Sequence, residues 1–363
     1  MDIVCEGLMI GHSGFAEAMR NVVLSLDAKG CKVKTIIHDN ATIGTSKELV
    51  RIKELERTEL KDKIKTWITM TYPLGVCNHE GHYSIAYVMF ETEVWPDDFT
   101  KHLIDMDEIW TPSTFCKDAM VKAGLKNVHV IPLGVDVERF NPKNIESLAC
   151  PPEMEGKFKF LSIFGWSERK GCSLLARAFA EEFQGQNDVA LYMKGGWYRE
   201  RRARRDVFNK LGDIPNPPYI HIDFKIYPFQ DLPRLYKLCD CFVMPTRGEG
   251  WGLEFTEAMA MEMPTIGTRW GGQLEFMDDD NSYLIDINGV KPCPTCDWIS
   301  AYYKGQNFAD PSKEHLRKLM RYVYEHRDES KTKGKYARQD MINRFTWAKS
   351  MQKAYDRLEA IHG

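Results

Sequence analysis

Short apolar runs alternate with amphipathic helical patterns along the chain, and this alternation predicts the fold class. Residues 3–10 are apolar enough for a strand, a helical pattern follows through residues 18–26, and residues 33–37 predict the next strand. This order favours a parallel sheet with helices on its faces. Further predicted strands are Trp67–Thr71, Ser84–Phe90, Phe158–Phe164, Val189–Lys194, Tyr219–Phe224, Cys241–Met244 and Pro264–Gly267. The sequence therefore predicts an α/β protein.

The length of the chain predicts two domains. At 363 residues it exceeds the size at which single hydrophobic cores usually stop growing. Residues 141–157 contain three prolines and interrupt the alternation of strands and helices, so we expect the linker there. We expect one domain at 1–145 and a second at 157–344. Residues 345–363 carry apolar side chains at helical spacing, which predicts a terminal amphipathic helix.

Composition and charge narrow the function classes. A hydrophobic content of 43% and a charged content of 28% are those of a globular protein. The formal net charge of −3 creates no overall field that would select nucleic acid or an anionic membrane. No apolar run approaches the roughly 20 residues that span a bilayer, and the first residues do not resemble a secretory signal. We therefore expect a cytoplasmic protein without an integral membrane segment. The sequence does not indicate its oligomeric state.

The ten cysteines do not form a disulfide framework in a chain of this length. Several of them, such as Cys5, Cys239 and Cys241, stand in apolar contexts where a reduced, buried thiol is expected. Cys293 and Cys296 make the one C-x-x-C pair, and no second pair of ligands stands at a usual zinc-site spacing. We interpret this pair as part of a proline-rich surface loop and expect no metal site.

The most informative stretch is the loop and helix after residues 241–244. That apolar run ends at Pro245, and three glycines with Glu249 between them precede a helical pattern that contains Glu257. Glycines let backbone amides approach a ligand, and the unpaired amides of a helix's first turn bind anions. Amides for a diphosphate and carboxylates for hydroxyls suit a sugar nucleotide. The alternative is a plain turn whose glutamates only stabilise the helix dipole.

Three segments carry a resemblance to a known family. The segment Glu249-Gly-Trp-Gly-Leu-Glu-Phe-Thr-Glu257, then Pro264-Thr265-Ile266 and Trp270-Gly271-Gly272, resembles the E-x7-E signature of the retaining family-4 glycosyltransferases. The resemblance implies a GT-B fold, in which two Rossmann-like domains face each other across a cleft and a C-terminal helix crosses back to the N-terminal domain. It also implies retaining transfer of a hexose from a nucleoside-diphosphate sugar to an acceptor hydroxyl of a glycan or lipid-linked saccharide, without a metal or cofactor.

The same resemblance assigns roles in the second half of the chain. Glu249 would hold sugar hydroxyls and Glu257 the ribose hydroxyls. Lys170 and Arg169 would stabilise the diphosphate as it leaves, with Arg169 replacing the family arginine at the position of Trp166. The backbone amides expected to contact sugar and phosphate belong to Gly250, Trp251, Gly252 and Leu253. The loop that contains Ile226 would pack against the nucleobase.

The first half of the chain supplies weaker expectations. By resemblance, the loop that contains Gly14 and Phe15 would approach the donor phosphates, and a plain strand-to-helix turn is the alternative. A polar residue, often histidine, occupies a strand end near the anomeric carbon in this family. Here Glu91 stands at that place, so we expect it to assist the acceptor. His79 and His82 are rival candidates.

Alternative functions stay open. Residues 199–205 carry five arginines, which indicate either an exposed helix face or a surface for a phosphate-rich acceptor. A glycosyltransferase that acts on hydroxymethylated bases in DNA is therefore one alternative. A non-catalytic protein that binds sugar nucleotides or glycans is another, and a phosphorylase is a third.

Overall fold

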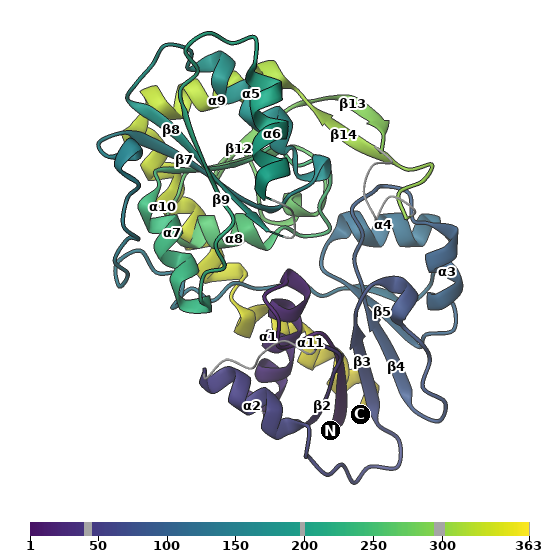
Figure 1. The fold of residues 1–363 in the computed structure, drawn as a ribbon. Coiled ribbons are helices and arrows are strands. Elements are labelled where there is room, and N and C mark those ends of the chain that lie inside the picture. Colours follow the sequence, from purple (N-terminus) through teal and green to yellow (C-terminus); the bar gives the residue numbers. More distant parts are fainter. Residues whose placement is uncertain (40–45, 197–199, 294–301, 363) are drawn as a thin grey trace. The chain divides into compact units, whose positions relative to one another are not determined.

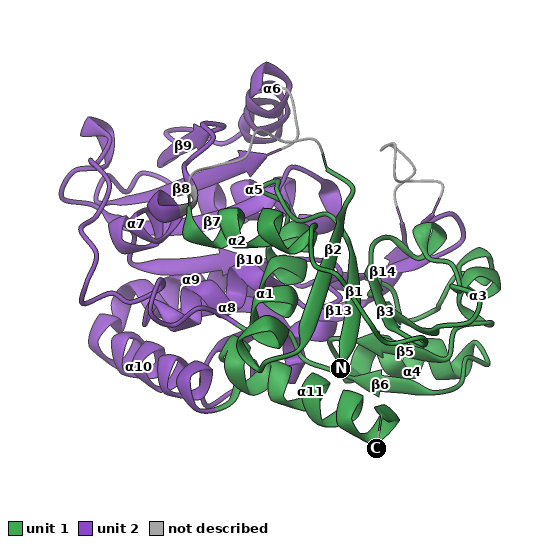
Figure 2. Ribbon diagram, turned by 90° about the horizontal axis from the view of Figure 1, so that it is seen from below, with its two compact units in different colours: residues 1–134, 344–363 green, residues 135–343 purple. Residues whose placement is uncertain are grey.

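The computed structural model describes residues 1–39, 46–196, 200–293 and 302–362. The chain divides into two compact units. The first comprises residues 1–134 and 344–363, and the second comprises residues 135–343 (Figure 2). Each unit has a parallel six-stranded sheet with helices packed on it (Figure 1).

The sheet of the first unit has the strand order β2-β1-β3-β4-β5-β6, and all of its neighbouring pairs are parallel. The strands are β1 (Asp2–Gly7), β2 (Lys32–Ile37), β3 (Thr66–Met70), β4 (Tyr83–Tyr87), β5 (Glu108–Thr111) and β6 (Val128–Val130). Ile3, Val4 and Cys5 of β1 are buried in succession, as expected for a central parallel strand that is covered on both faces.

The helices of the first unit include one from each end of the chain. They are α1 (Gly14–Ala28), α2 (Lys47–Leu55), α3 (Asp97–Leu103), α4 (Thr114–Lys122) and α11 (Trp347–His362), with a short 3₁₀ turn η1 (Pro73–Gly75). α11 packs beside α1 (Figure 2). The Arg357 guanidinium pairs with the buried Glu108 carboxylate of β5, and the Ser350 hydroxyl donates to the carbonyl of Leu133 at 3.1 Å. These contacts make α11 part of the first unit.

The sheet of the second unit has the order β12-β11-β10-β7-β8-β9, again with parallel pairs. Its strands are β7 (Phe158–Gly165), β8 (Val189–Gly196), β9 (Tyr219–Asp223), β10 (Cys241–Met244), β11 (Thr265–Thr268) and β12 (Tyr283–Ile285). A separate antiparallel hairpin follows, made of β13 (Ile287–Pro292) and β14 (Asn307–Pro311).

Helices α5 to α10 belong to the second unit. They are α5 (Cys172–Glu182), α6 (Glu200–Leu211), α7 (Leu232–Leu238), α8 (Leu253–Ala260), α9 (Lys313–Glu325) and α10 (Arg327–Arg344). The 3₁₀ turns are η2 (Pro152–Met154), η3 (Glu168–Lys170), η4 (Phe229–Asp231) and η5 (Gly272–Glu275). α5 contacts both α6 and α9, and its Phe179 packs against Phe160 of β7 and Phe183 in an aromatic cluster under the sheet.

The first unit ends at Gly134, earlier than the expected boundary at residue 145. The physical reason is that residues 135–140 are bound to the second unit. The Arg338 guanidinium of α10 donates to the carbonyls of Val137 and Phe140, and the Phe140 ring packs edge-on against Tyr236. The prolines of the 141–157 segment therefore lie within the second unit rather than between the two.

The described residues include no helix that is both long and apolar enough to cross a membrane. Burial raises the pKa of Cys5, Cys239 and Cys241, so these thiols stay protonated at neutral pH. Cys296 lies outside the described residues, so the interpretation of the C-x-x-C pair as part of a surface loop stays a prediction. The cytoplasmic location stays a prediction.

A side chain at position 134 should overpack the contact between this segment and α11. A Cβ at Gly134 would lie 2.5 Å from Cα and N of Trp347, the first residue of α11. We expect Gly134→Ala to lower the free energy of unfolding by about 1–3 kcal/mol, because α11 must shift to make room. Urea denaturation measures this. Gly165→Ala is the control, since no atom lies within 4 Å of its added Cβ. Equal midpoints for the two variants would contradict the prediction.

Candidate active site

Two loops at the carboxyl ends of neighbouring strands form the candidate site. β7 and β10 pair at the point where the strand order reverses, since β8 and β9 lie on one side and β11 and β12 on the other. Ligands of open parallel sheets bind at such switch points. The loop after β7 contains Arg169 and Lys170, and the loop after β10 runs from Pro245 to Gly252. The Arg247 amide donates to the Arg169 carbonyl at 2.6 Å and joins the two loops.

A glycine lets these loops approach each other. Gly171 has a φ of 75°, and a Cβ there would lie 2.2 Å from the carbonyl oxygen of Pro245. Any other residue at this position would separate the loops and would also strain the backbone. Gly252, with a φ of 96°, is the N-cap of α8. The path of the second loop into α8 therefore depends on a conformation that favours glycine.

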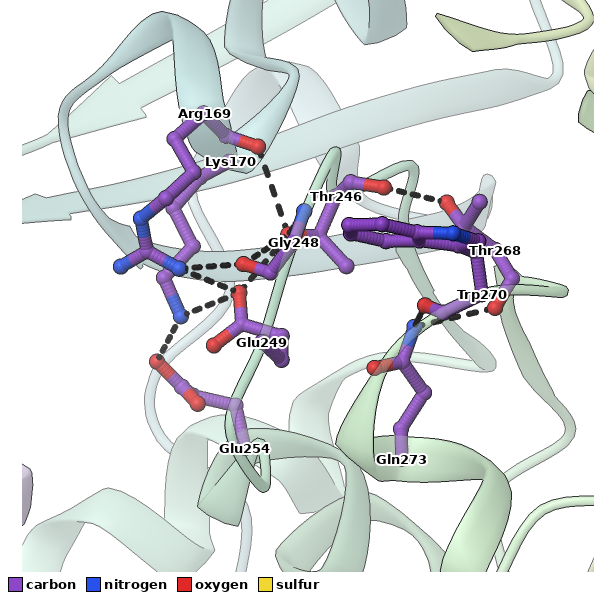
Figure 3. A network of polar contacts seen from close by, with 9 residues as sticks. All are labelled: Arg169, Lys170, Thr246, Gly248, Glu249, Glu254, Thr268, Trp270 and Gln273. Atoms are coloured by element: carbon purple, nitrogen blue, oxygen red, sulfur yellow. Dashed lines mark hydrogen bonds and ion pairs between the residues drawn. The ribbon is translucent and has the colours of Figure 1, made fainter. Parts of the chain in front are cut away.

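The loops bring two cations to one buried carboxylate. Oε1 of Glu249 lies 2.9 Å from Lys170 Nζ and 3.1 Å from Arg169 Nη1, and it accepts a hydrogen bond from the Thr246 hydroxyl at 2.7 Å. Lys170 Nζ also donates to Oε1 of Glu254 at 3.1 Å. Figure 3 shows both cations pointing at the Glu249 carboxylate. Sequence reasoning brought Glu249, Lys170 and Arg169 to one site, and the structure places them in direct contact.

The electrostatics of the cluster keep its members ionised. Burial alone would raise the pKa of Glu249, but the charges of Lys170 and Arg169 and the Thr246 hydrogen bond outweigh it, so this pKa lies below its ordinary value. Burial would likewise lower the pKa of Lys170, and the negative charges of Glu249 and Glu254 raise it instead. At neutral pH the pair is a carboxylate and an ammonium.

The segment after β11 fixes the backbone of Glu249. The Gly272 amide donates to the Glu249 carbonyl at 2.7 Å. A Cβ on Gly271, whose φ is 105°, would approach the Glu249 carbonyl oxygen to 3.1 Å. The Thr268 hydroxyl donates to the Thr246 carbonyl at 2.6 Å, and the buried Gln273 amide spans the carbonyls of Thr268 and Trp270 (Figure 3). The loop after β7 and the segment after β11 thus both hold Glu249 in place.

The second glutamate of the motif, Glu257, lies on the buried side of α8. Its Oε2 accepts a hydrogen bond from the Tyr236 hydroxyl of α7 at 2.7 Å. Burial, followed by the charge of Glu257, raises the pKa of Tyr236, so the tyrosine remains a donor at neutral pH. Glu257 is therefore oriented by a neighbouring helix.

Comparison with known proteins identifies the part of the chain that carries this site. Residues 157–291 match the family model described as glycosyl transferases group 1. The matched residues lie within the second unit and include both loops of the candidate site.

Curated bacterial proteins are similar to part of the chain. Mannosylfructose-phosphate synthase of Agrobacterium fabrum is 28% identical over 155 residues, which are 40% of this chain and 34% of that protein. The GDP-mannose-dependent alpha-(1-6)-phosphatidylinositol monomannoside mannosyltransferase of Mycolicibacterium smegmatis is 29% identical over 217 residues, 56% of this chain and 52% of that protein. The match therefore spans between about a third and about half of the length of these two relatives.

Solved structures share the fold over nearly the whole chain. Sucrose-phosphate synthase from Thermosynechococcus elongatus has a TM-score of 0.68 at 16% identity and covers 99% of both chains. The Anabaena protein HepE, solved with UDP and glucose, has a TM-score of 0.68 at 12% identity and covers 99% of this chain and 100% of its own. The predicted class, an α/β chain of GT-B type with two Rossmann-like units, is confirmed.

The remaining donor-site candidates of the second unit surround the opening of α8 or lie further along the sheet edge. Gly250 and Trp251 are buried, and Leu253 begins the helix half-buried. Ile226, in the loop after β9, is 83% exposed. Their contacts with a donor stay predictions.

The sequence analysis did not identify a polar cluster beside the loop of Ile226, nor two residues that contact Glu249 or Lys170. The buried carboxylate of Asp223 accepts hydrogen bonds from the Tyr192 hydroxyl at 2.7 Å and the Tyr227 hydroxyl at 2.6 Å. Thr246 and Glu254 were also missed. Their place at the end of a strand and in the first turn of a helix was a signal that could have identified them.

The first-unit candidates lie in the segments that follow β1 and β4. Gly14 and Phe15 open α1, and the Asp39 carboxylate holds the loop before them by accepting from the amides of Met9 and Ile10 at 2.8 Å each. β4 ends at Tyr87 rather than at residue 90, so the half-buried Glu91 follows the strand by several residues. The roles of Gly14, Phe15 and Glu91 stay predictions.

His79, another candidate for assisting the acceptor, contacts neighbouring side chains of the first unit. Its ring stacks on Trp67 with centroids 3.7 Å apart, and its Nε2 lies 3.3 Å from Oε2 of Glu6. Burial is the largest influence on the pKa of His79 and lowers it, against the charge of Glu6. These contacts orient the ring, and the role of His79 or His82 at an acceptor stays a prediction.

The basic segment forms one exposed side of α6. Arg201, Arg202 and Arg205 are exposed, while Ala203 and Val207 pack inward. Arg199 lies outside the described residues. A role for this surface in acceptor binding stays a prediction. No group of three or more metal-ligating side chains is placed to hold a metal in the part of the chain that the structure describes.

Replacing Glu249 by glutamine should show how much its charge contributes to the free energy of unfolding. Because the pKa of Glu249 is lowered in the folded state, its contribution is fully present above the ordinary carboxylate pKa and is lost as pH falls through the folded value. We expect Glu249→Gln to reduce the free energy of unfolding by about 1–3 kcal/mol at pH 7. The difference from wild type should shrink from about pH 5 downward.

Urea denaturation at several pH values measures this difference. Glu314→Gln is the matched control, because Glu314 is an exposed glutamate in the first turn of α9. A destabilisation by Glu249→Gln that does not change with pH would contradict the prediction.

Proposed function

We propose that this chain is a retaining glycosyltransferase that moves a hexose from a nucleoside-diphosphate sugar to an acceptor hydroxyl. The observation that carries the proposal is the buried Glu249 carboxylate with Lys170 and Arg169 at the opening of α8. Cations fixed in place stabilise the negative charge that develops on a leaving diphosphate. The amide groups at the start of α8 add a fixed partial positive charge.

The geometry of Glu249 supports a role in holding the sugar. The donors that reach it from the described residues all contact Oε1, and none of them contacts Oε2. A carboxylate oxygen can accept a hydrogen bond from a sugar hydroxyl, and a charged acceptor strengthens that bond. Lys170 and Arg169 fix the carboxylate through Oε1, so the other oxygen is oriented in advance.

The comparisons support the class of donor. One protein that is similar to part of the chain is named as GDP-mannose-dependent, and HepE, which shares the fold, has been solved in complex with UDP-glucose. We propose a nucleoside-diphosphate hexose as donor and Glu257 as the group that binds the ribose hydroxyls. Retention of configuration and independence of metal are proposed from the resemblance in the E-x7-E segment. A glycan or lipid-linked saccharide is the proposed acceptor.

The experiment that tests the proposal starts from ligand binding. A ligand that binds only the folded state raises its melting temperature, so thermal shifts with UDP-, GDP- and ADP-sugars identify the donor. Incubation with that donor and candidate acceptors, followed by NMR of the anomeric proton, then shows transfer and its stereochemistry. Donor binding without transfer or hydrolysis would favour a non-catalytic binding protein, and inverted configuration would contradict retention.

Lys170→Ala should affect turnover more than donor affinity. The ammonium meets charge that grows as the diphosphate leaves, so its loss should lower kcat by roughly 10²-fold, as for other fixed transition-state donors. Steady-state kinetics with the donor found above measure this. Lys318→Ala, at an exposed position of α9, is the control. A kcat equal to that of wild type would count against the assignment of Lys170.

Glu257→Ala should instead act on donor binding. We expect the KM for the donor to rise about tenfold, since a charged hydrogen-bond acceptor contributes about 1.5–3 kcal/mol. Tyr236→Phe is the companion variant, because it removes the hydroxyl that orients Glu257 and keeps the ring. Its KM should lie between those of wild type and Glu257→Ala. An unchanged KM for Glu257→Ala would exclude the proposed ribose contact.

A further inference from the structure

Lys170 contacts two carboxylates, and the function proposed above assigns a role to only one of them, Glu249. Its ammonium lies 2.9 Å from Oε1 of Glu249 and 3.1 Å from Oε1 of Glu254. The side chains of Lys170 and Glu249 are 8% and 7% exposed, whereas that of Glu254 is 23% exposed. Glu254 is thus the partner that can most easily turn toward solvent.

Glu254 also stands at the start of α8, where an anion is favoured. It is the acidic residue of the helix's first turn, after the N-cap Gly252. The carboxylate therefore has the two properties that the site offers to a diphosphate: contact with Lys170 and a position at a helix N-terminus. Glu254 therefore puts a carboxylate of the protein at the position where we propose that the diphosphate of the ligand binds.

The charges of the cluster balance before any ligand arrives. The two cations, Arg169 and Lys170, are matched by the two carboxylates, Glu249 and Glu254. Without Glu254 the cluster would carry a formal charge of +1. A sugar nucleotide or its nucleoside-diphosphate product adds further negative charge, so Glu254 opposes the binding of either.

We propose that Glu254 competes with the ligand's diphosphate for Lys170 and thereby weakens the binding of the nucleoside-diphosphate product. The proposal rests on the function proposed above, because it requires a diphosphate at Lys170. When the diphosphate binds, Lys170 exchanges the Glu254 carboxylate for a phosphate oxygen, and Glu254 turns outward. When the product leaves, Glu254 returns to the ammonium.

The competition acts more strongly on product than on donor. Cleavage of the sugar–oxygen bond leaves its electron pair on the terminal phosphate, which then has an ionisation that the donor's diester lacks. A terminal phosphate with a pKa near 6 is mostly doubly ionised at pH 7. The repulsion from Glu254 therefore increases at the moment of transfer, and it favours release of the product.

The test compares ligands of increasing charge on Glu254→Gln and wild type. For the UDP, GDP or ADP that binds wild type, we expect Glu254→Gln to lower the Kd by roughly five- to tenfold, the effect of one charge a few ångströms away in a partly exposed site. The monophosphate should gain less, and the uncharged nucleoside should bind as before. Isothermal titration calorimetry measures the three Kd values, and stopped-flow displacement should show slower release of the diphosphate.

Two controls separate the possible causes. Glu314→Gln removes the same charge from the first turn of α9 and should leave all three Kd values unchanged. Glu254→Ala removes the carboxylate in a different way and should reproduce the gain in affinity, which guards against a local defect of the glutamine variant. Because the effect is electrostatic, added salt should reduce it.

The outcomes distinguish this inference from the proposed function. If none of the three nucleoside diphosphates binds wild type, the proposed donor class is wrong and the inference fails with it. If a diphosphate binds and Lys170→Ala weakens it, but both Glu254 variants bind it as wild type does or more weakly, the function stands and the competition is excluded. An equal gain for diphosphate and nucleoside would also overturn the inference, since charge would not be its cause.

Discussion

The candidate site depends on the neutralisation of one buried carboxylate. A charged Glu249 away from water would be strongly unfavourable alone, and the contacts of Lys170, Arg169 and Thr246 make it favourable. Those contacts require that the loops after β7 and β10 touch, and Gly171 is the residue that lets them do so. The burial of one charge thus requires that two loops far apart in the sequence pack against each other.

The same constraint fixes the positions of both glutamates of the site. Glu249 is held through its side chain by the loop after β7 and through its backbone by the segment after β11. Glu257 is held from a third direction by Tyr236. Preorganised groups lose little freedom when they act on a substrate, which is the condition under which fixed charges contribute most to a reaction.

The fold class was predictable from the sequence, and Glu249, Lys170 and Arg169 could be proposed as one site, because both inferences depend on local signals. Alternating strands and helices follow from apolar patterning, and Glu249, Lys170 and Arg169 stand in loops marked by glycines and charge. The domain boundary at Gly134 was not predictable in this way, because Arg338 binds the carbonyls of Val137 and Phe140 from a distant helix. The extent of β4, which ends at Tyr87, was overestimated because Val88 and Phe90 are buried without being part of the strand. The pairing of Glu254 with Lys170 joins the first turn of α8 to the loop after β7, and it has no signature in the sequence.

The return of α11 to the first unit has a consequence for the order of synthesis. Residues 135–343 leave the ribosome complete before residues 347–362 have emerged. The buried side of α1 and the carboxylate of Glu108 therefore have no partner helix until α11 has been made, so the packing of the first unit is completed after the whole second unit has been synthesised.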